Sequence, residues 1–498
     1  MTGNPLLAFD LGAESGRAIL GRFDGERLEL EELHRFPTGG TAVFDLLYWD
    51  VLRLHDGIKQ GLRAAAGAGI ASVGVDTWGV DFGLLAADGS LLDNPRHYRD
   101  PRTEGVLDRA LERVSRERVF AATGVQLLPI NTLFQLLSMQ EQSAPQLGAA
   151  HRLLMMADLL HYFLTGEQVC EFTNATTTQL YDPRQGRWST ELLEAFGLPH
   201  GILPEIVPPG TRIGPLLETV SRDCGLASGI PVVAPATHDT GAAVAAVPAE
   251  GADFAYISSG TWSLMGAELQ TPDLSDGALR YNFTNEGGVG GTFRFLKNIM
   301  GLWLVQECRR TWAAAGRERS YAELTRAAEE APGFGPLVDP DDGRFLPPGD
   351  MPGRVAAFCR ETGQTEPGGE GAVIRCLLES LALKYRWVLE RLEEVLGRRL
   401  EPVHVVGGGI RNTLLCQLTA DATGRPVVAG PAEATAIGNI LVQALGLGRI
   451  GSAGDIRAVV RASFEPRTFA PDGDHGRWEE AYGRFCRLLP DSPLASEG

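Results

Sequence analysis

The 498-residue chain is too long for a single compact core, so about two to four domains are expected. Its formal net charge of -18 argues against a nucleic-acid-binding protein, because such proteins use clustered Lys and Arg to neutralise phosphates. The 44% hydrophobic and 22% charged content is typical of a globular protein.

The cysteines are odd in number and scattered, with no C-x-x-C pair, which predicts free thiols rather than a disulfide framework or a zinc site. The opening residues MTGNPLLAFDLGAESGR lack the pattern of a signal peptide, and no apolar run reaches membrane length. We therefore expect a cytoplasmic protein with no membrane partner.

The first elements predicted along the chain are a strand, a turn and a second strand. Apolar runs at Leu6–Phe9 and Ala18–Phe23 flank a Gly-containing turn. Residues 71–86 predict another buried strand, interrupted by a polar corner that contains glycine. Helical stretches are expected between these segments and again after Thr103.

Around residues 245–254 the sequence AAVPAEGADF is typical of a connector between domains. We therefore predict two domains, 1–246 and 247–498. The segment AYISSGTWSLMG that follows repeats the strand, glycine turn and strand of the N-terminus, which indicates a weak internal duplication.

Later segments favour a second α/β domain. Residues 403–444 alternate strand, Gly-rich turn, helix, strand, turn and helix. Phe334–Gly353 is rich in Pro, Gly and Asp and predicts a long ordered loop, and the chain is expected to fray after about Leu489.

The turn between the first two strands suits a phosphate group. Backbone N–H groups of such a turn converge on an anion, and Asp10 at the strand end can hold a hydrated Mg²⁺. Taken alone, this motif favours a plain hairpin with glycine at a positive φ. Its recurrence at Ser258–Thr261 favours two hairpins that grip the phosphates of one nucleotide.

The segment PVVAPATHDTGAAVAAV predicts a strand, a polar corner and a helix of small residues. Asp239 is placed at the N-terminus of that helix, where its carboxylate can orient a hydroxyl or accept its proton. An ordinary helix cap is the alternative, and on local pattern alone it is favoured. His238 by itself is equally consistent with a local hydrogen bond.

Glycines 407–409 follow a buried strand and let a flat ligand such as adenine approach the backbone, although a tight turn explains them equally well. The spacing G-x-G-x-x-G is absent here and no Gly-Lys pair occurs in the chain, which disfavours a dinucleotide fold and a Walker A site. Lys59, Lys297 and Lys384 are the lysines, so bound phosphate must be held mainly by backbone N–H groups, Arg and a metal ion.

Phe295–Arg310 has helical spacing, with its apolar residues expected in the core. Asn298 and Gln306 are the polar exceptions, and on a helix they share one side. Their amides are candidates to reach a sugar or a nucleotide, with solvent exposure as the alternative.

Taken together and in order, ten motifs of the chain resemble those of the FGGY carbohydrate kinase family. They are DLGAESGR, DTWGVDF, YRDPRT, NTLFQL, TNATTTQL, THDT, SSGTWSLMG, TNEGG, LKNIMGLWLVQ and GGGIRNTLLCQLTADATG. Many related kinases share DLG and GGG. The combination of DTWGVDF, TNATTTQL and LKNIMGLWL is more specific and is most similar to the rhamnulokinase branch of the family.

The resemblance implies an α/β fold of two actin-like (ribonuclease H-like) ATPase domains with an interdomain catalytic cleft. The first domain carries the phosphate loop and binds the sugar, and the second binds the adenosine of ATP. By position, the implied ATP-binding residues are Ala13, Glu14, Ser15, Gly16, Arg17, Thr261, Gln306 and Gly408. The implied sugar-binding residues are Gly79, His238, Asp239, Thr240 and Asn298, with Asp239 as the catalytic base. Mg²⁺ is the expected metal, held through water by Asp10.

The resemblance also implies the reaction, which is ATP-dependent phosphorylation of L-rhamnulose. A related ketose such as L-fuculose or D-xylulose is an alternative substrate, and an actin-like ATP-driven chaperone or scaffold is an alternative of another class. The expected partners are the sugar and ATP, and the protein is a monomer or a homodimer. Glu14 departs from the family pattern, which commonly has a small polar residue at this position of the phosphate loop. A carboxylate close to a triphosphate repels it unless the side chain is turned outward or paired.

Overall fold

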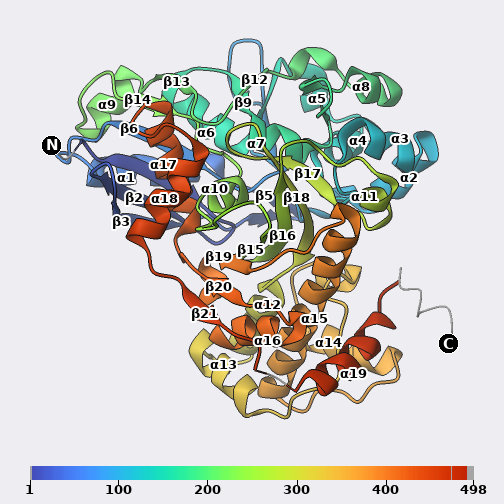
Figure 1. Ribbon diagram of the computed structural model, residues 1–498. Helices are drawn as coiled ribbons and strands as arrows, with labels where there is room; N and C mark the ends of the chain where they lie inside the picture. Colours follow the sequence, from blue (N-terminus) through green and yellow to red (C-terminus); the bar gives the residue numbers. More distant parts are fainter. Residues whose placement is uncertain (1–2, 473, 491–498) are drawn as a thin grey trace. The chain divides into compact units, whose positions relative to one another are not determined.

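The computed structural model describes residues 3–472 and 474–490. Fraying was expected after about Leu489, and residues 491–498 of that end lie outside the described residues. Its contacts group the chain into two compact units (Figure 1). The first contains Met1–Pro248, Glu268–Phe295 and Glu433–Glu465, and the second contains Ala249–Ala267, Leu296–Ala432 and Pro466–Gly498. The first unit therefore includes two later segments that a division at residue 246 assigns to the second domain.

A six-stranded sheet with the order β13-β14-β6-β1-β2-β3 forms the centre of the first unit. Its strands are β1 (Leu6–Leu11), β2 (Ser15–Phe23), β3 (Leu28–Pro37), β6 (Ser72–Asp76), β13 (Arg212–Pro215) and β14 (Pro231–Val233). β1 pairs antiparallel with β2 and parallel with β6, and β6 pairs parallel with β14. The predicted N-terminal hairpin and the buried strand after residue 71 are both confirmed.

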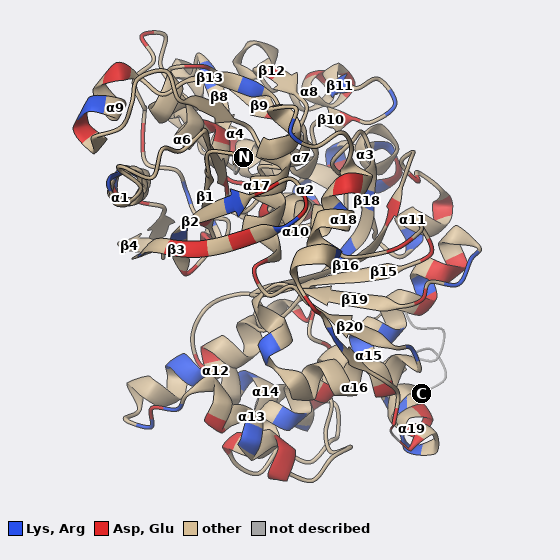
Figure 2. Cartoon of the chain, turned by 60° about the vertical axis from the view of Figure 1, so that its left-hand side comes forward, with Lys and Arg blue, Asp and Glu red and all other residues tan. Residues whose placement is uncertain are grey.

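The burial of β1 and β3 matches their positions in the sheet. Every residue of β1 is buried, as expected for a central strand covered on both faces. β3 lies at the sheet edge and carries exposed charged residues (Figure 2), which discourage pairing with another chain.

Two helices of the first unit support the site described below. α10 (Asp239–Ala245) follows β14, and α17 (Ala434–Gly446) packs against α10, β1 and β6. Gly438 of α17 allows this close approach, since a Cβ placed there would lie 1.9 Å from the carbonyl oxygen of Ala242. In Figure 1, α10 and α17 are drawn close together although they are far apart in sequence.

The first unit contains further helices, several of which contact strands of the six-stranded sheet. They are α1 (Val51–Ala64), α2 (Val106–Arg113), α3 (Arg116–Thr123), α4 (Thr132–Glu141), α5 (Pro145–Ala149), α6 (Met156–Thr165), α7 (Phe172–Ala175), α8 (Thr190–Phe196), α9 (Glu218–Cys224), α11 (Asp276–Arg280) and α18 (Ala453–Ser463). Short 3-10 turns are η1 (Pro101–Thr103), η2 (Thr176–Thr178) and η3 (His200–Ile202). Small two-stranded pairings join β4 (Thr41–Val43) with β5 (Leu46–Tyr48), β7 (Phe82–Leu85) with β8 (Arg152–Met155), β9 (Val169–Glu171) with β12 (Glu205–Val207), and β10 (Tyr181–Asp182) with β11 (Arg187–Trp188).

The second large sheet has the order β17-β18-β16-β15-β19-β20-β21. Its strands are β15 (Ala255–Ser259), β16 (Trp262–Leu269), β17 (Thr284–Gly287), β18 (Phe293–Met300), β19 (Val403–Val406), β20 (Val427–Ala429) and β21 (Arg467–Phe469). β15 pairs antiparallel with β16 and parallel with β19, and β19 pairs parallel with β20. These pairings repeat those of β1, β2, β6 and β14, so the duplication expected from the sequence is present in the topology.

The helices of the second unit complete the list of elements. They are α12 (Trp303–Ala314), α13 (Tyr321–Glu330), α14 (Met351–Glu361), α15 (Glu370–Leu396), α16 (Thr413–Thr423) and α19 (His475–Cys486), with the 3-10 turns η4 (Gly343–Phe345) and η5 (Gly408–Arg411). The strand and helix alternation predicted for residues 403–444 is confirmed.

The continuous helix predicted for Phe295–Arg310 is wrong in its first half. Residues up to Met300 belong to β18, and the helix α12 begins at Trp303. Asn298 therefore lies on a strand and Gln306 on the helix after it. Nearly every residue of β18 is buried. A strand with two buried faces lacks the alternation of apolar and polar residues that distinguishes a strand from a helix in the sequence.

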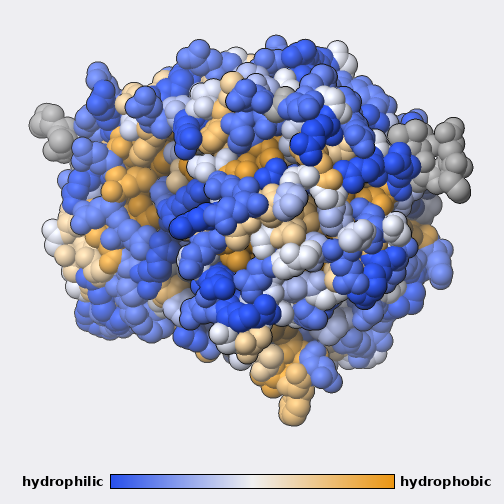
Figure 3. Space-filling view, turned by 90° about the horizontal axis from the view of Figure 1, so that it is seen from below, coloured by the Kyte–Doolittle hydropathy of each residue, from blue (hydrophilic) through white to orange (hydrophobic). Residues whose placement is uncertain are grey.

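One face of the molecule is largely polar. Figure 3 shows mainly hydrophilic residues on the face seen from below, interrupted by hydrophobic areas. All seven cysteines are buried free thiols, as expected. Within residues 3–472 and 474–490, no helix combines the length and apolarity needed to cross a membrane.

Candidate active site

The β1–β2 hairpin of the first unit carries the predicted phosphate loop. The turn is closed by a hydrogen bond from the Gly12 N–H to the Ser15 carbonyl, 3.1 Å long. The Glu14 residue is exposed, while Gly16 is buried and packs against Phe36, where a Cβ would approach ring atoms to 2.6 Å. Ala13 and Ser15 are half-buried.

Arg17 is the cross-strand neighbour of Asp10 and forms ion pairs with both Asp10 and Glu433. Burial raises the pKa of the Asp10 carboxyl, while the guanidinium of Arg17 acts in the opposite direction. The Arg17 side chain is thus already held by two carboxylates, one from β1 and one from the start of α17.

Asp76 lies beside Asp10 at the end of the parallel neighbour β6. Its side chain is fully buried and accepts a hydrogen bond of 2.5 Å from the Asn439 amide of α17. Burial, followed by the charge of Asp10 and to a lesser degree that of Asp239, raises the pKa of Asp76 well above its ordinary range. Three carboxyl groups therefore gather at the carboxyl ends of the central strands.

Asp239 is the first residue of α10, as predicted, and the chain around Thr77 holds it in place. The Thr77 N–H donates to the Thr237 carbonyl at 2.9 Å, and the Asp239 N–H donates to the Thr77 carbonyl at 2.8 Å. Asp239 Oδ1 accepts hydrogen bonds from the Thr240 N–H at 2.5 Å and the Thr240 hydroxyl at 3.1 Å. The Asp239 side chain remains 31% exposed.

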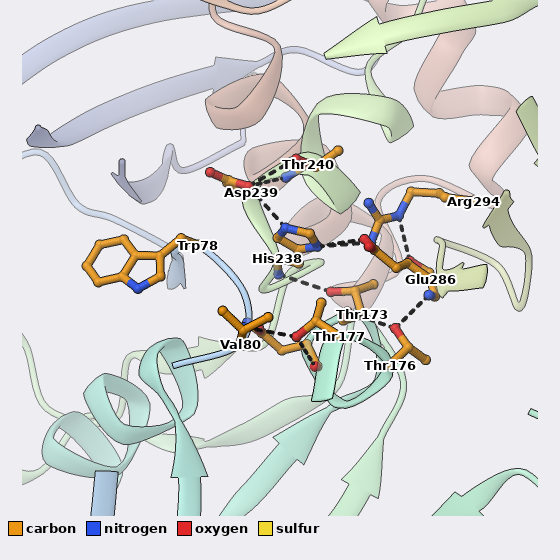
Figure 4. Close-up of polar contacts among 12 residues, drawn as sticks. Trp78, Val80, Thr173, Thr176, Thr177, His238, Asp239, Thr240, Glu286 and Arg294 are labelled. Carbon is orange, nitrogen blue, oxygen red and sulfur yellow. Dashed lines mark hydrogen bonds and ion pairs between the residues drawn. The ribbon is translucent and has the colours of Figure 1, made fainter. Parts of the chain in front are cut away.

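His238 precedes Asp239 and sits in a buried polar network (Figure 4). Its Nε2 lies 3.5 Å from Asp239 Oδ1, and its Nδ1 lies 3.2 Å from Glu286 Oε2 and 3.1 Å from Arg294 Nη2. Glu286 and Arg294 form an ion pair of 3.2 Å, and the Arg294 side chain is fully buried. The imidazole ring of His238 therefore has a polar neighbour at each of its two nitrogens.

The TNATTTQL motif supports the backbone of the THDT motif. Buried Glu171 accepts hydrogen bonds from the Thr237 N–H at 2.9 Å and the Thr237 hydroxyl at 2.8 Å, and it also binds Thr173. The Thr173 hydroxyl accepts from the His238 N–H at 3.1 Å. The two motifs therefore form one buried scaffold.

Gly79 lies next to this scaffold, in the DTWGVDF motif. A Cβ at Gly79 would approach the Thr177 side chain to 2.9 Å, so packing against Thr177 requires glycine here. Val80 has φ of 65°, which is unusual for a β-branched residue. The Thr177 hydroxyl accepts from the Val80 N–H at 3.0 Å, and the Thr132 hydroxyl donates to the Val80 carbonyl at 2.6 Å.

Asp81 belongs to the same motif and is a buried hydrogen-bond acceptor for four groups. It accepts from the indole N–H of Trp49 at 2.6 Å and of Trp78 at 3.1 Å, from the Tyr98 N–H at 3.1 Å and from the Gln135 amide at 2.9 Å. Burial raises the pKa of Asp81 to about 6, against the lowering effect of these hydrogen bonds.

The remaining predicted residues belong to the second unit. Thr261 lies in the β15–β16 turn, and its carbonyl accepts a hydrogen bond of 3.1 Å from the N–H of Trp303 at the start of α12. That contact brings the turn next to the helix that carries Gln306. Asn298 is half-buried on β18.

The glycines after β19 divide into two kinds. A Cβ at Gly407 or Gly409 would come within 2.9 Å or 2.0 Å of Ser259, so both are required for packing against β15. Gly408 is exposed, and a Cβ there would meet no atom within 4 Å. Two of the three glycines therefore form a tight turn against β15, and the third faces open space.

Sequence reasoning did not assign Glu286, Arg294, Asp76 or Asp81 to the site. Glu286 occurs in TNEGG, which resembles the family, and Arg294 stands between two phenylalanines in a strand that is otherwise mostly apolar. A charged residue inside a buried apolar run was the available signal, because such a charge requires a partner.

Comparison with known proteins places these features in a family. The model of the N-terminal domain of the FGGY family of carbohydrate kinases matches residues 6–246, and that of the C-terminal domain matches residues 255–447. A rhamnulokinase of Bacteroides thetaiotaomicron is 47% identical over 480 residues, covering 96% of this chain and 98% of that protein. A rhamnulokinase of Enterococcus faecalis is 42% identical and covers 97% of both chains.

Solved structures agree in fold. A xylulose kinase from Lactobacillus acidophilus superposes with a TM-score of 0.80 at 14% identity, covering 99% of this chain and 100% of that chain. A Plasmodium falciparum glycerol kinase superposes with a TM-score of 0.75, also at 14% identity, and covers 98% of each chain. The fold and the matched models define a two-domain α/β carbohydrate kinase. The chain belongs to the FGGY family of carbohydrate kinases.

Proposed function

We propose that this carbohydrate kinase transfers the γ-phosphoryl group of ATP to the primary hydroxyl of L-rhamnulose, giving L-rhamnulose 1-phosphate and ADP in L-rhamnose catabolism. The substrate is supported by similarity to proteins named rhamnulokinase, at 40 to 47% identity over nearly the whole chain. The motifs DTWGVDF and TNATTTQL support it further through their similarity to the rhamnulokinase branch, and their residues hold the backbone next to Asp239.

The accessibility of Asp239 is the observation that carries the assignment of the base. Its side chain is 31% exposed, whereas the side chain of Asp10 is 9% exposed, that of Glu286 is 5% exposed, and Asp76 and Asp81 are fully buried. Among these carboxyl groups, Asp239 is the one most open to a substrate hydroxyl.

In the proposed step, the substrate oxygen forms a bond to the γ-phosphorus while the bond from that phosphorus to the leaving ADP oxygen breaks. Asp239 accepts the proton of the attacking hydroxyl, and hydrogen bonds from Thr240 hold its carboxylate. Because the transition state is loose, positioning of the hydroxyl contributes more than base strength. His238, Gly79 and Thr240 are the further sugar-binding residues proposed for the first unit, and Asn298 is the one proposed for the second.

For ATP, we assign the phosphates to the backbone of Ala13–Arg17 and to Thr261, and the adenosine to Gln306 and Gly408. Arg17 is already paired with Asp10 and Glu433, so backbone N–H groups are expected to contribute most of the phosphate contacts. The exposed position of Glu14 at the turn gives its carboxylate access to solvent, which screens its charge. Open space at Gly408 suits a flat ring.

Asp10 fits a role in binding Mg²⁺. Magnesium in kinases keeps several waters and is held by one or two carboxylates together with substrate phosphates, so no complete protein cage is required. When bound, the ion neutralises charge on the phosphates.

Seven free thiols fit a reducing, cytoplasmic setting.

Replacing Asp239 with Asn tests the proposed base. The variant keeps the size of the side chain and one acceptor oxygen for the Thr240 donors, but it cannot accept the proton, so kcat with L-rhamnulose should fall by roughly 10²- to 10⁴-fold. Sugar binding, measured by calorimetry, should persist. Near-wild-type kcat in this variant would show that another group is the base.

Asp276→Asn is the matched control. Asp276 is also the first residue of a short helix of the first unit, α11, and it is exposed. This variant should retain wild-type kcat and KM.

A further inference from the structure

The Glu286–Arg294 ion pair is buried in the first unit directly against His238 (Figure 4). The Arg294 side chain is 0% exposed and that of Glu286 is 5% exposed. Removing two such charges from water is costly, and a buried pair is often no more stabilising than apolar residues of the same size. Stability alone is therefore a weak explanation for this pair.

The orientation of the guanidinium is fixed by the strands that carry it. Arg294 Nε donates to the Gly287 carbonyl at 2.8 Å, and the Gly287 N–H donates to the Thr176 hydroxyl at 2.7 Å. These bonds tie β17 and β18 to the TNATTTQL segment and aim Arg294 Nη2 at the imidazole of His238.

The chemistry of arginine decides which tautomer this geometry favours. A guanidinium has five N–H donors and no acceptor, so its 3.1 Å hydrogen bond with His238 requires Nδ1 to be the acceptor. In a neutral imidazole the proton is then on Nε2. Nε2 is the ring nitrogen that faces Asp239, at 3.5 Å from Oδ1.

Glu286 has two possible partners at the same distance. Its Oε2 lies 3.2 Å from Arg294 Nη2 and 3.2 Å from His238 Nδ1. The first contact balances the guanidinium charge and is compatible with the tautomer above. The contact between Glu286 Oε2 and His238 Nδ1 becomes a hydrogen bond only if Nδ1 carries a proton. A proton on Nδ1 would displace the Arg294 donor from that nitrogen.

We propose that Glu286 and Arg294 are positioning residues that hold His238 as the neutral Nε2–H tautomer, so that the ring presents a hydrogen-bond donor beside the Asp239 carboxylate. The acceptor is an oxygen of the sugar, either a hydroxyl or the carbonyl, and this part rests on the proposed function. Arg294 supplies the orienting donor, and Glu286 compensates its charge. His238 then contributes to binding the sugar while Asp239 takes the proton.

The tautomer can be measured directly on the ligand-free wild-type protein. In full-length protein labelled with ¹⁵N-histidine, long-range ¹H–¹⁵N correlation spectra distinguish protonated from unprotonated ring nitrogens, and His238→Asn identifies the signal. A proton on Nε2 with an unprotonated Nδ1 is expected. A proton on Nδ1, alone or on both nitrogens, would overturn the proposal whether or not any variant folds.

The kinetic consequence is tested with Arg294→Met. This change removes the donor to Nδ1, so the sugar KM should rise roughly tenfold or more while the KM for ATP stays within about twofold. Arg375→Met is the control, because Arg375 pairs with buried Glu379 on α15 of the second unit; it should lower thermal stability without changing the sugar KM.

Glu286→Gln provides a second, milder variant that keeps the side-chain shape. It should leave the proton on Nε2 and raise the sugar KM by less than Arg294→Met does. A folded Arg294→Met protein with an unchanged sugar KM would overturn the positioning role. Lack of turnover of L-rhamnulose by the wild type would instead refute the proposed substrate and leave the tautomer result intact.

Discussion

Asp81 shows how one buried carboxyl group organises aromatic side chains next to the proposed sugar site. The indole N–H groups of Trp49 and Trp78 both donate to it, and the two rings lie 3.9 Å apart between centroids. Trp78 immediately precedes Gly79, one of the residues assigned to the sugar. Asp81 thereby fixes the conformation of the DTWGVDF segment through contacts that do not involve the substrate.

Because burial raises the pKa of Asp81 to about 6 from an ordinary value of 3.8, this residue makes stability depend on pH. Between these values the folded protein retains the proton and the unfolded chain has lost it. The folded state therefore binds more protons, and its stability falls as pH rises through this window. The contribution of Asp81 is at most about 3 kcal/mol.

Asp81→Asn should remove this contribution. Relative to the variant, the wild-type free energy of unfolding should decrease as pH rises from about 4 to about 6, and the difference should level off above that range. Urea unfolding of both proteins across this range measures it. Parallel pH profiles for the two proteins would contradict the account of Asp81.

At the scale of elements, the position of Asp239 depends on how α10 packs against α17. Gly438 lies where a Cβ would meet the backbone of α10, 1.9 Å from the Ala242 carbonyl oxygen. A backbone atom cannot move aside as a flexible side chain can. Any side chain at Gly438 must therefore push the helices apart and shift the residue at the start of α10.

Gly438→Ala should destabilise the protein by about 1–3 kcal/mol through overpacking, despite the better helix propensity of alanine. It should also lower kcat, because misplacement of a catalytic group by about 1 Å can cost roughly 10²-fold in rate. Thermal unfolding and steady-state kinetics measure the two effects.

Gly483→Ala on α19 is the matched control. A Cβ there would meet no atom within 4 Å, so this change should be neutral or stabilise by up to about 1 kcal/mol. If Gly438→Ala behaved like Gly483→Ala, the contact between α10 and α17 would not position Asp239.

The same elements show which features local sequence can predict. Glycine turns between apolar runs predicted the hairpins β1–β2 and β15–β16, and a polar corner before small residues predicted α10 with Asp239 at its start. Each of these signals lies within about ten residues. The strand β18 was predicted as part of a helix. Both of its faces are buried, so its apolar residues fit the 3.6-residue repeat of a helix as well as the two-residue repeat of a strand.

Contacts between distant segments could not be predicted from one sequence. Arg294 and His238 are separated by 56 positions, and Asp76 and Asn439 by 363. Their pairing depends on how the strands and helices assemble, which neither periodicity nor local motifs encode. Gly79 came from the resemblance to the kinase family alone, because no physical signal in the sequence singled it out. Asn298 and Gln306 stood out as polar exceptions in an apolar segment, and the resemblance supplied their individual ligands.

At the scale of the whole molecule, the two large sheets repeat one succession of pairings. β1, β2, β6 and β14 correspond in this respect to β15, β16, β19 and β20. The chain is nonetheless not divided at a single point, because α17 and α18 return to the first unit. The late segment that contains Glu433 and Asn439 therefore contributes to the environment of Arg17 and Asp76, so the N-terminal part of the chain is incomplete without it.

The central claim is that this chain phosphorylates L-rhamnulose. A coupled assay of ADP release with MgATP tests it against L-rhamnulose, L-fuculose, D-xylulose and glycerol, with a control that contains no sugar. We expect kcat/KM for L-rhamnulose to exceed that for every other sugar by at least about tenfold, with negligible release in the control. A preference for another sugar would contradict the substrate while keeping the family, and ADP release independent of sugar would favour an ATP-driven chaperone or scaffold.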